Sequence, residues 1–298
     1  MATALIHSYG SVKPLELRLP VAKSTCETAL KEVGKILQLR KESLDVFALF
    51  CGEMDKPIKV LQPSDIVPVG TELSLQRWYM QTDEYKAIRH DDAAIHHLCC
   101  EARAKIQRGD MHPSDEQLQQ LEDFSDPFFP TERQYLEVAM KVSGYSMLVA
   151  RGCTVVEALE DNAVTLCPGT LVTVSMDLCG LSVKCEGELQ RPMLHWPWTV
   201  VRRWKRSASA ETTYIKFEVC LQKQNAGILT WICLETPQAL LLFQCVSALC
   251  AEIKRGMDDK RALLTDPVPS LAGRFHDPLR EWVDNTLFTS GPRFSKIK

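Results

Sequence analysis

The chain has 298 residues, a length at which single hydrophobic cores usually stop growing, so two or three lobes are expected. Its formal net charge of −3, without a long run of one sign, argues against nucleic-acid binding and favours a protein partner. No apolar stretch approaches the roughly 18 residues that indicate a membrane-spanning helix.

The N-terminus and the cysteines predict the compartment. A secretory signal peptide has a positive segment and then an apolar run, and the range 1–6 has neither. We therefore expect a cytoplasmic protein with reduced thiols, in contact with membranes only peripherally. Most of the 12 cysteines lie in apolar patterns that predict small core residues, among them Cys179, Cys220, Cys233 and Cys245.

The first eighty residues predict two strands, a helix and two further strands. The hairpin turns at Gly10, and the helix opens at Ser24 and Thr25, with Glu27 as the N3 partner of a capping box. The segments that predict the strands are Ile6, 15–21, 44–50 and 72–78. This ββαββ order is a ubiquitin-like layout.

Helical periodicity dominates the middle of the chain. The predicted helices cover 83–89, 93–108, 114–121 and 131–142. We expect a helical lobe here.

The second of these helices carries His96-His97-x-Cys99-Cys100, which has the composition of a metal site. On a helix, however, only His96 and Cys100 stand four residues apart on one side. Structural zinc takes four ligands, so we interpret these residues as half-buried helix positions and predict no metal.

Strand-length runs precede one long amphipathic helix in the C-terminal half. The runs are 171–176, 181–185, 198–204, 213–221 and 228–234. Pro197 lies where one strand ends and the next begins. After Thr236 and Pro237, apolar residues recur at helical spacing until Gly256. The order predicts a sheet of five strands closed by a helix.

A tail follows. The range 257–272 has the composition of a linker, and 278–288 is a short amphipathic segment with Leu279, Trp282, Val283 and Leu287 on one face. Docking on the lobes and binding to a partner both stay open.

No catalytic signature is present: the GxSxG, P-loop, HExxH and Gly-rich dinucleotide motifs are all absent. We predict no catalytic residue and no cofactor, although a triad assembled from distant residues stays open.

Several medium-strength motifs resemble FERM domains of the sorting-nexin type. They are the run Leu19–Thr25, the strand Phe47–Phe50, the Leu75-x-x-Trp78 close, the Gly144-Tyr145 step, the Gly180-Leu181-x-Val183 strand and the Pro197-Trp198 junction. The resemblance covers about residues 1 to 255 and implies an α+β fold of three lobes. These would be a ubiquitin-like β-grasp (1–80), a helical acyl-CoA-binding-protein-like lobe (81–148), and a PH/PTB-like β-sandwich with a C-terminal capping helix (149–256), followed by the tail (257–298). We do not expect the PX domain that precedes the first lobe in those sorting nexins.

The resemblance also implies a peptide-binding edge in the third lobe, where cytoplasmic tails with an Asn-Pro-x-Tyr or Asn-x-x-Tyr motif add as a strand. Trp204 matches the family's groove tryptophan, and Cys220 replaces a bulkier apolar residue. A role of Trp204 in the core stays open as well. The predicted peptide contacts are Val201, Arg203, Trp204, Val219, Cys220, Phe243 and Val246.

The resulting prediction is a non-enzymatic cytoplasmic adaptor in membrane-protein trafficking, peripheral on endosomal or plasma membrane. One alternative is phosphoinositide binding by the basic residues Arg202, Arg203, Lys205 and Arg206. Another is a regulatory scaffold that binds a small GTPase or a membrane protein through the first two lobes.

Overall fold

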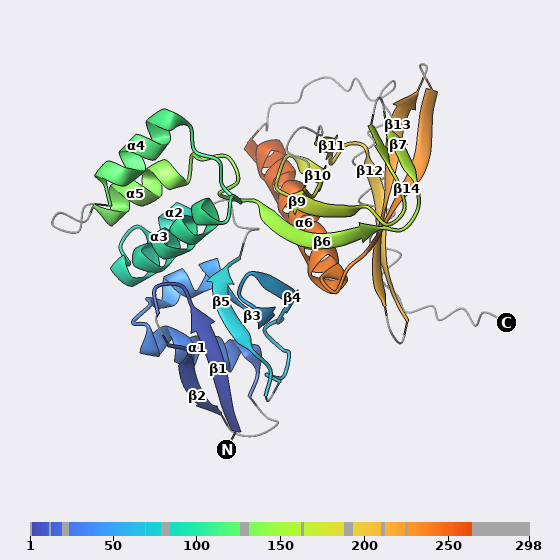
Figure 1. Ribbon diagram of the computed structural model, residues 1–298. Helices are drawn as coiled ribbons and strands as arrows, with labels where there is room; N and C mark the ends of the chain where they lie inside the picture. The colour runs from blue at the N-terminus through green and yellow to red at the C-terminus, as the bar shows by residue number, and fades with distance from the viewer. Residues whose placement is uncertain are drawn as a thin grey trace. The chain divides into compact units, whose positions relative to one another are not determined.

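The computed structural model describes residues 2–11, 13–19, 24–68, 70–78, 84–125, 131–161, 164–187, 193–209, 212–223 and 226–263 (Figure 1). The chain forms two compact units, Met1–Ala150 and Arg151–Lys298. The predicted lobe boundaries at residues 80, 148 and 256 stay predictions, and the predicted segment 278–288 lies outside the described residues.

The first unit combines a sheet with a group of helices (Figure 1). Its elements are β1 (Ala2–Ser8), β2 (Leu15–Leu19), α1 (Cys26–Ile36), the 3-10 helix η1 (Lys41–Val46), β3 (Phe47–Glu53), β4 (Lys56–Val60), β5 (Leu73–Arg77), α2 (Glu84–Ile88), α3 (Asp92–Gln107), α4 (Asp115–Asp123) and α5 (Glu132–Ala139).

The sheet of this unit has the order β2-β1-β5-β3-β4, with β1 and β5 parallel. Helix α1 buries Ala29 and Val33 in the same core as Leu49 and Leu73 of the sheet, and all four side chains are inaccessible to solvent. A mixed sheet crossed by one helix is the β-grasp arrangement that the sequence predicts.

Two local predictions in this region are wrong. The predicted strand at 44–50 begins only at Phe47, because η1 precedes it, and a short apolar run does not distinguish a strand from a helical turn. The N-cap of α1 is Thr25, whose side chain accepts a hydrogen bond from the Thr28 amide at 3.3 Å. Glu27 therefore makes no capping box and pairs instead with Lys31 at 2.5 Å.

The helices begin close to their predicted positions. Ser114 forms a full capping box with Gln117 at the start of α4. Asp91 caps α3 by accepting from the Ala94 amide at 3.1 Å, and its other oxygen accepts from the Arg40 amide at 2.7 Å. Because Arg40 immediately precedes η1, one buried carboxylate joins α3 to the β-grasp part of the unit.

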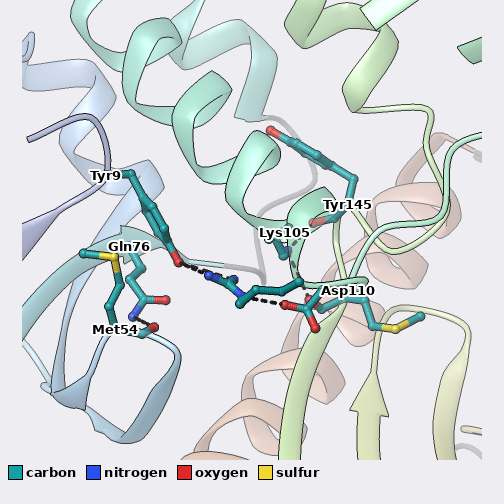
Figure 2. Close-up of polar contacts among 8 residues, drawn as sticks. Tyr9, Met54, Gln76, Lys105, Asp110 and Tyr145 are labelled. Carbon is teal, nitrogen blue, oxygen red and sulfur yellow. Dashed lines mark hydrogen bonds and ion pairs between the residues drawn. The ribbon is translucent and has the colours of Figure 1, made fainter. Parts of the chain in front are cut away.

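A partly buried polar network also joins the helices to the β1–β2 turn of the β-grasp part (Figure 2). Arg108 donates to the Tyr9 hydroxyl at 3.4 Å and to the Asp110 carboxylate at 3.0 Å. Lys105 is 3% exposed and donates to the Tyr145 carbonyl at 2.8 Å. Burial lowers the pKa of Lys105 to about 8. The Arg108–Tyr9 and Asp91–Arg40 contacts connect α3 and the residue after it to the β-grasp part, in agreement with one compact unit over residues 1–150.

The second unit is a curved sheet with a long helix (Figure 1). Its elements are β6 (Leu148–Val155), β7 (Leu159–Asp161), β8 (Val164–Leu166), β9 (Leu171–Met176), β10 (Gly180–Cys185), β11 (Leu194–Pro197), β12 (Val201–Ala208), β13 (Thr213–Lys223), β14 (Ala226–Glu235) and α6 (Ala239–Leu263). The sheet order is β11-β10-β9-β6-β14-β13-β12, and β7 and β8 form a separate pair.

Helix α6 packs against β12 and β13 and buries Leu242 and Val246 completely. The sheet presents Phe217 and Ile232 to the same core, at 0% and 1% exposure. The predicted order of strands followed by one closing helix is correct in outline.

Three details of the prediction are wrong in this unit. The main sheet has seven strands rather than five, because β6 and β11 gave no separate signal. Residues 198–200 form a turn, so β12 begins at Val201 and extends to Ala208 instead of covering 198–204. Helix α6 also passes Gly256 and ends at Leu263.

All 12 cysteines lie in the described ranges and carry free thiols. Cys233 and Cys245 are buried as predicted, whereas Cys179 is exposed and Cys220 is half-buried. Cys179 lies in the turn before β10, outside the alternating pattern of the strand. Among the described helices, none is both long and apolar enough to cross a bilayer.

Candidate peptide-binding edge of the second unit

Strand β12 lies at one end of the seven-stranded sheet. Among the described strands it pairs with β13 alone, in antiparallel register, with Trp204 opposite Phe217 and Arg203 opposite Glu218. The register shifts between Val201 and Arg203, which marks a β-bulge. An end strand of this kind has the geometry to accept a further strand.

Trp204 lies on the α6 side of β12. It shares a face with Phe217, because directly paired residues project to the same side of a sheet. Its indole nitrogen donates to the Ser247 hydroxyl at 3.2 Å, and Ser247 donates to the Phe243 carbonyl at 2.8 Å. Trp204, Ser247 and Phe243 are all half-buried, and we call this surface the β12–α6 edge.

The opposite face of the same strands carries a different cluster. Arg203 makes two hydrogen bonds to Glu218, at 2.7 and 2.6 Å, and this partner raises the Arg203 pKa. Trp231 lies beside this pair, with the Arg203 guanidinium 5.8 Å and the Lys205 ammonium 4.7 Å from its ring centre. Arg203 and Lys205 thus lie on the face opposite Trp204, as strand alternation predicts.

Three residues of the predicted contact set are inaccessible to solvent in the structure. Val201, Val219 and Val246 are each 0% exposed, so they form the core beneath the edge and present no surface to a ligand. Cys220 is half-buried and projects away from Val219, onto the face opposite Trp204. The periodic pattern marked these positions as apolar, but it did not distinguish a groove wall from the core under it.

Ser247 is the contact that sequence reasoning missed. It is a polar residue inside the apolar pattern of α6, four residues after Phe243, and this spacing places the two on one side of the helix. The sequence signal for this contact was a serine on the apolar face of the predicted helix.

The cluster of histidines and cysteines for which no metal was predicted lies on α3 of the first unit. No group of three or more metal-ligating side chains occurs within the described ranges. His97 and Cys99 are buried, while His96 and Cys100 share one side of α3, with 3.7 Å between Nε2 and Sγ. Two convergent ligands fall short of a structural zinc site.

Comparison with known proteins adds the following findings. No protein-family profile matches the chain. Human sorting nexin-31 (Homo sapiens) is 23% identical over 305 aligned positions, which cover 93% of this chain and 66% of that protein. The crystal structure of the FERM and C-terminal domain complex of Drosophila Merlin superposes with a TM-score of 0.54 and 12% identity, over 87% of this chain and 99% of that one.

The β-grasp sheet, the helices α2–α5 and the sheet closed by α6 together form a FERM-like fold. The sequence relationship to sorting nexin-31 is weak but spans 93% of this chain, and it supports a FERM-like domain of the sorting-nexin type. Both statements agree with the resemblance drawn from the sequence.

Proposed function

We propose that the chain is a non-enzymatic adaptor in membrane-protein trafficking, and that its β12–α6 edge binds Asn-Pro-x-Tyr or Asn-x-x-Tyr motifs in cytoplasmic tails. The ligand adds as a strand alongside β12, where main-chain hydrogen bonds supply affinity and side-chain contacts supply specificity. We expect a dissociation constant on the order of micromolar, which corresponds to about −8 kcal/mol.

The position of Trp204 carries this proposal. It projects from an end strand of the sheet toward α6, is half-buried, and its ring nitrogen is fixed by Ser247 at 3.2 Å. An aromatic ring held in this way needs little further ordering when a ligand packs on it, and large rings supply much of the contact energy at interfaces. The relationship to sorting nexin-31 supports a trafficking role.

Lipid binding by the basic strand is the weaker alternative. Of its four cations, Arg203 is already paired with the buried carboxylate of Glu218, and Lys205 lies over the ring of Trp231. Arg203 therefore brings little uncompensated charge to an anionic surface. Lipid binding would weaken steeply with salt, peptide addition would weaken little, and GTPase binding would depend on the nucleotide.

The test compares two tryptophans of one sheet. Trp204 and Trp231 are both half-buried, but they lie on opposite faces. Binding of a fluorescent Asn-Pro-x-Tyr peptide is measured by anisotropy for the wild-type chain, Trp204→Ala and Trp231→Ala. We expect Trp204→Ala to weaken binding at least about tenfold, because the variant loses a contact worth more than about 1.4 kcal/mol.

Trp231→Ala is the matched control for the loss of a large ring, and it should change the dissociation constant less than about twofold. Equal weakening by both variants would show a general loss of structure. Unchanged binding by Trp204→Ala would place the peptide elsewhere.

A further inference from the structure

Three side chains of the first unit form a nucleophile, base and orienter arrangement outside the β12–α6 edge. Cys100 Sγ lies 3.7 Å from His96 Nε2, and His96 Nδ1 lies 2.7 Å from the Glu132 carboxylate. His96 and Cys100 come from one turn of α3, and Glu132 is the first residue of α5. A thiol in reach of an imidazole that a carboxylate orients has the geometry of an activated nucleophile.

The hydrogen bonds define the tautomer of this histidine. An ionised carboxylate only accepts, so His96 Nδ1 donates to Glu132, and whenever the ring is neutral its lone pair is on Nε2. That lone pair faces the Cys100 thiol, which can donate its proton to it. The ring is therefore set to act as a base toward sulfur.

The charged and titratable groups around the thiol show why it needs a base. Burial raises the pKa of Cys100, with a further contribution from Glu132, and the Arg103 guanidinium opposes the shift. The neighbouring Cys99 is buried, has its pKa raised to about 12, and donates to the Glu132 carbonyl. At neutral pH the Cys100 thiol is thus protonated, and His96 is the group positioned to remove the proton.

The space around the thiol limits the size of a reactant. Gly10, in the β1–β2 turn, faces the pair so closely that a Cβ built on it would lie 3.1 Å from His96 Nε2 and 3.2 Å from Cys100 Sγ. Cys100 is half-buried, whereas the His96 side chain is 54% exposed. The backbone at Gly10 therefore crowds one side of the sulfur, which favours a small reactant over a bulky one.

We infer that Cys100 is a site of covalent modification by small hydroperoxides, with His96 as acid and base and Glu132 as its positioning residue. The thiol proton passes to His96 Nε2, sulfur attacks one peroxide oxygen, an S–O bond forms and the O–O bond breaks. The departing oxygen takes the proton from His96. Sulfur is oxidised to sulfenic acid, and the peroxide is reduced to water or an alcohol. A hydroperoxide needs this proton, since hydroxide is a poor leaving group.

The experiment treats the full chain with hydrogen peroxide at neutral pH, traps sulfenic acid with dimedone, and follows each cysteine by mass spectrometry. Cys167 and Cys179 are exposed and serve as references in the same sample. Exposure alone predicts that these two react faster than Cys100. Base assistance predicts that Cys100 reacts first.

His96→Asn should slow labelling of Cys100 at least about tenfold, since a positioned base is worth about a hundredfold or more. Glu132→Gln should slow it by a smaller factor, and neither variant should alter Cys167. Cys99 is buried, so its labelling shows that a variant has unfolded. For an unfolded variant, the test is the wild-type comparison of Cys100 with Cys167 and Cys179. The inference is overturned if Cys100 of the wild-type chain labels no faster than Cys167. It is also overturned if Cys100 labels at the wild-type rate in folded His96→Asn.

Discussion

Single buried residues of the first unit couple its stability to pH, and His97 is one of them in the acidic range. Its ring stacks edge-on against Phe47 at 5.0 Å, and Nδ1 lies 3.3 Å from the Ser8 hydroxyl. Burial lowers the His97 pKa to about 4 from 6.5, although the Glu101 carboxylate opposes the shift. The folded state therefore holds this ring neutral.

The sign of the pH effect follows from proton uptake. Between pH 6.5 and about 4 the unfolded chain binds a proton at His97 that the folded chain does not, so stability falls as pH is lowered through this window. From pH 7 to pH 5 the wild-type chain should lose about 2 kcal/mol more unfolding free energy than His97→Phe. Urea unfolding at both pH values measures the difference. Parallel losses in both proteins would show that His97 does not titrate differently in the folded state.

The face of the sheet to which each β12 side chain points was predictable, because side chains alternate along a strand whatever the tertiary structure. The burial of Val201 and Val219 was not, since an apolar residue on a strand fits a groove wall and a core equally well. Neither was the approach of Glu132 to His96, because it depends on the packing of α5 against α3.

Secondary-structure elements of the first unit are joined through caps as well as through apolar packing. Asp91 is 2% exposed and serves both the α3 amide of Ala94 and the Arg40 amide. Ser114 caps α4 at the surface and holds a reciprocal bond with Gln117.

Asp91→Ala should lower the unfolding free energy by about 2 to 3 kcal/mol, because it removes a cap and leaves the Arg40 amide without its acceptor. Ser114→Ala is the matched control, a cap of one helix only, and should cost about 1 kcal/mol. Urea denaturation followed by circular dichroism measures both. Equal losses would show that the Arg40 contact adds nothing to the cap.

The strands and helices were predictable where a long pattern or a cap specifies them, as with α3, α4, β9 and β13. They were not predictable where the signal is short. Strand β11 has four residues and ends at Pro197, and η1 occupies an apolar run that a strand fits equally well. The N-cap of α1 is Thr25 instead of Ser24, and local sequence leaves open the choice between these two good capping residues.

Across the full chain, the order of elements was more informative than any single motif. The β-grasp pattern, the helices and the sheet with its closing helix predicted a FERM-like fold, and the structure has it. The ligand depends on a surface assembled from β12 and α6, whose residues lie about forty positions apart in the sequence. Such a surface follows from sheet order, which sequence patterns do not encode.

Hydrogen exchange with a saturating Asn-Pro-x-Tyr peptide distinguishes the two ends of the sheet in the second unit. We predict slower amide exchange in β12 and in the turn of α6 around Ser247, with no change in β11 at the opposite end. Protection confined to β11 or to the first unit, or no protection at a peptide concentration that saturates binding, would contradict strand addition at the β12–α6 edge.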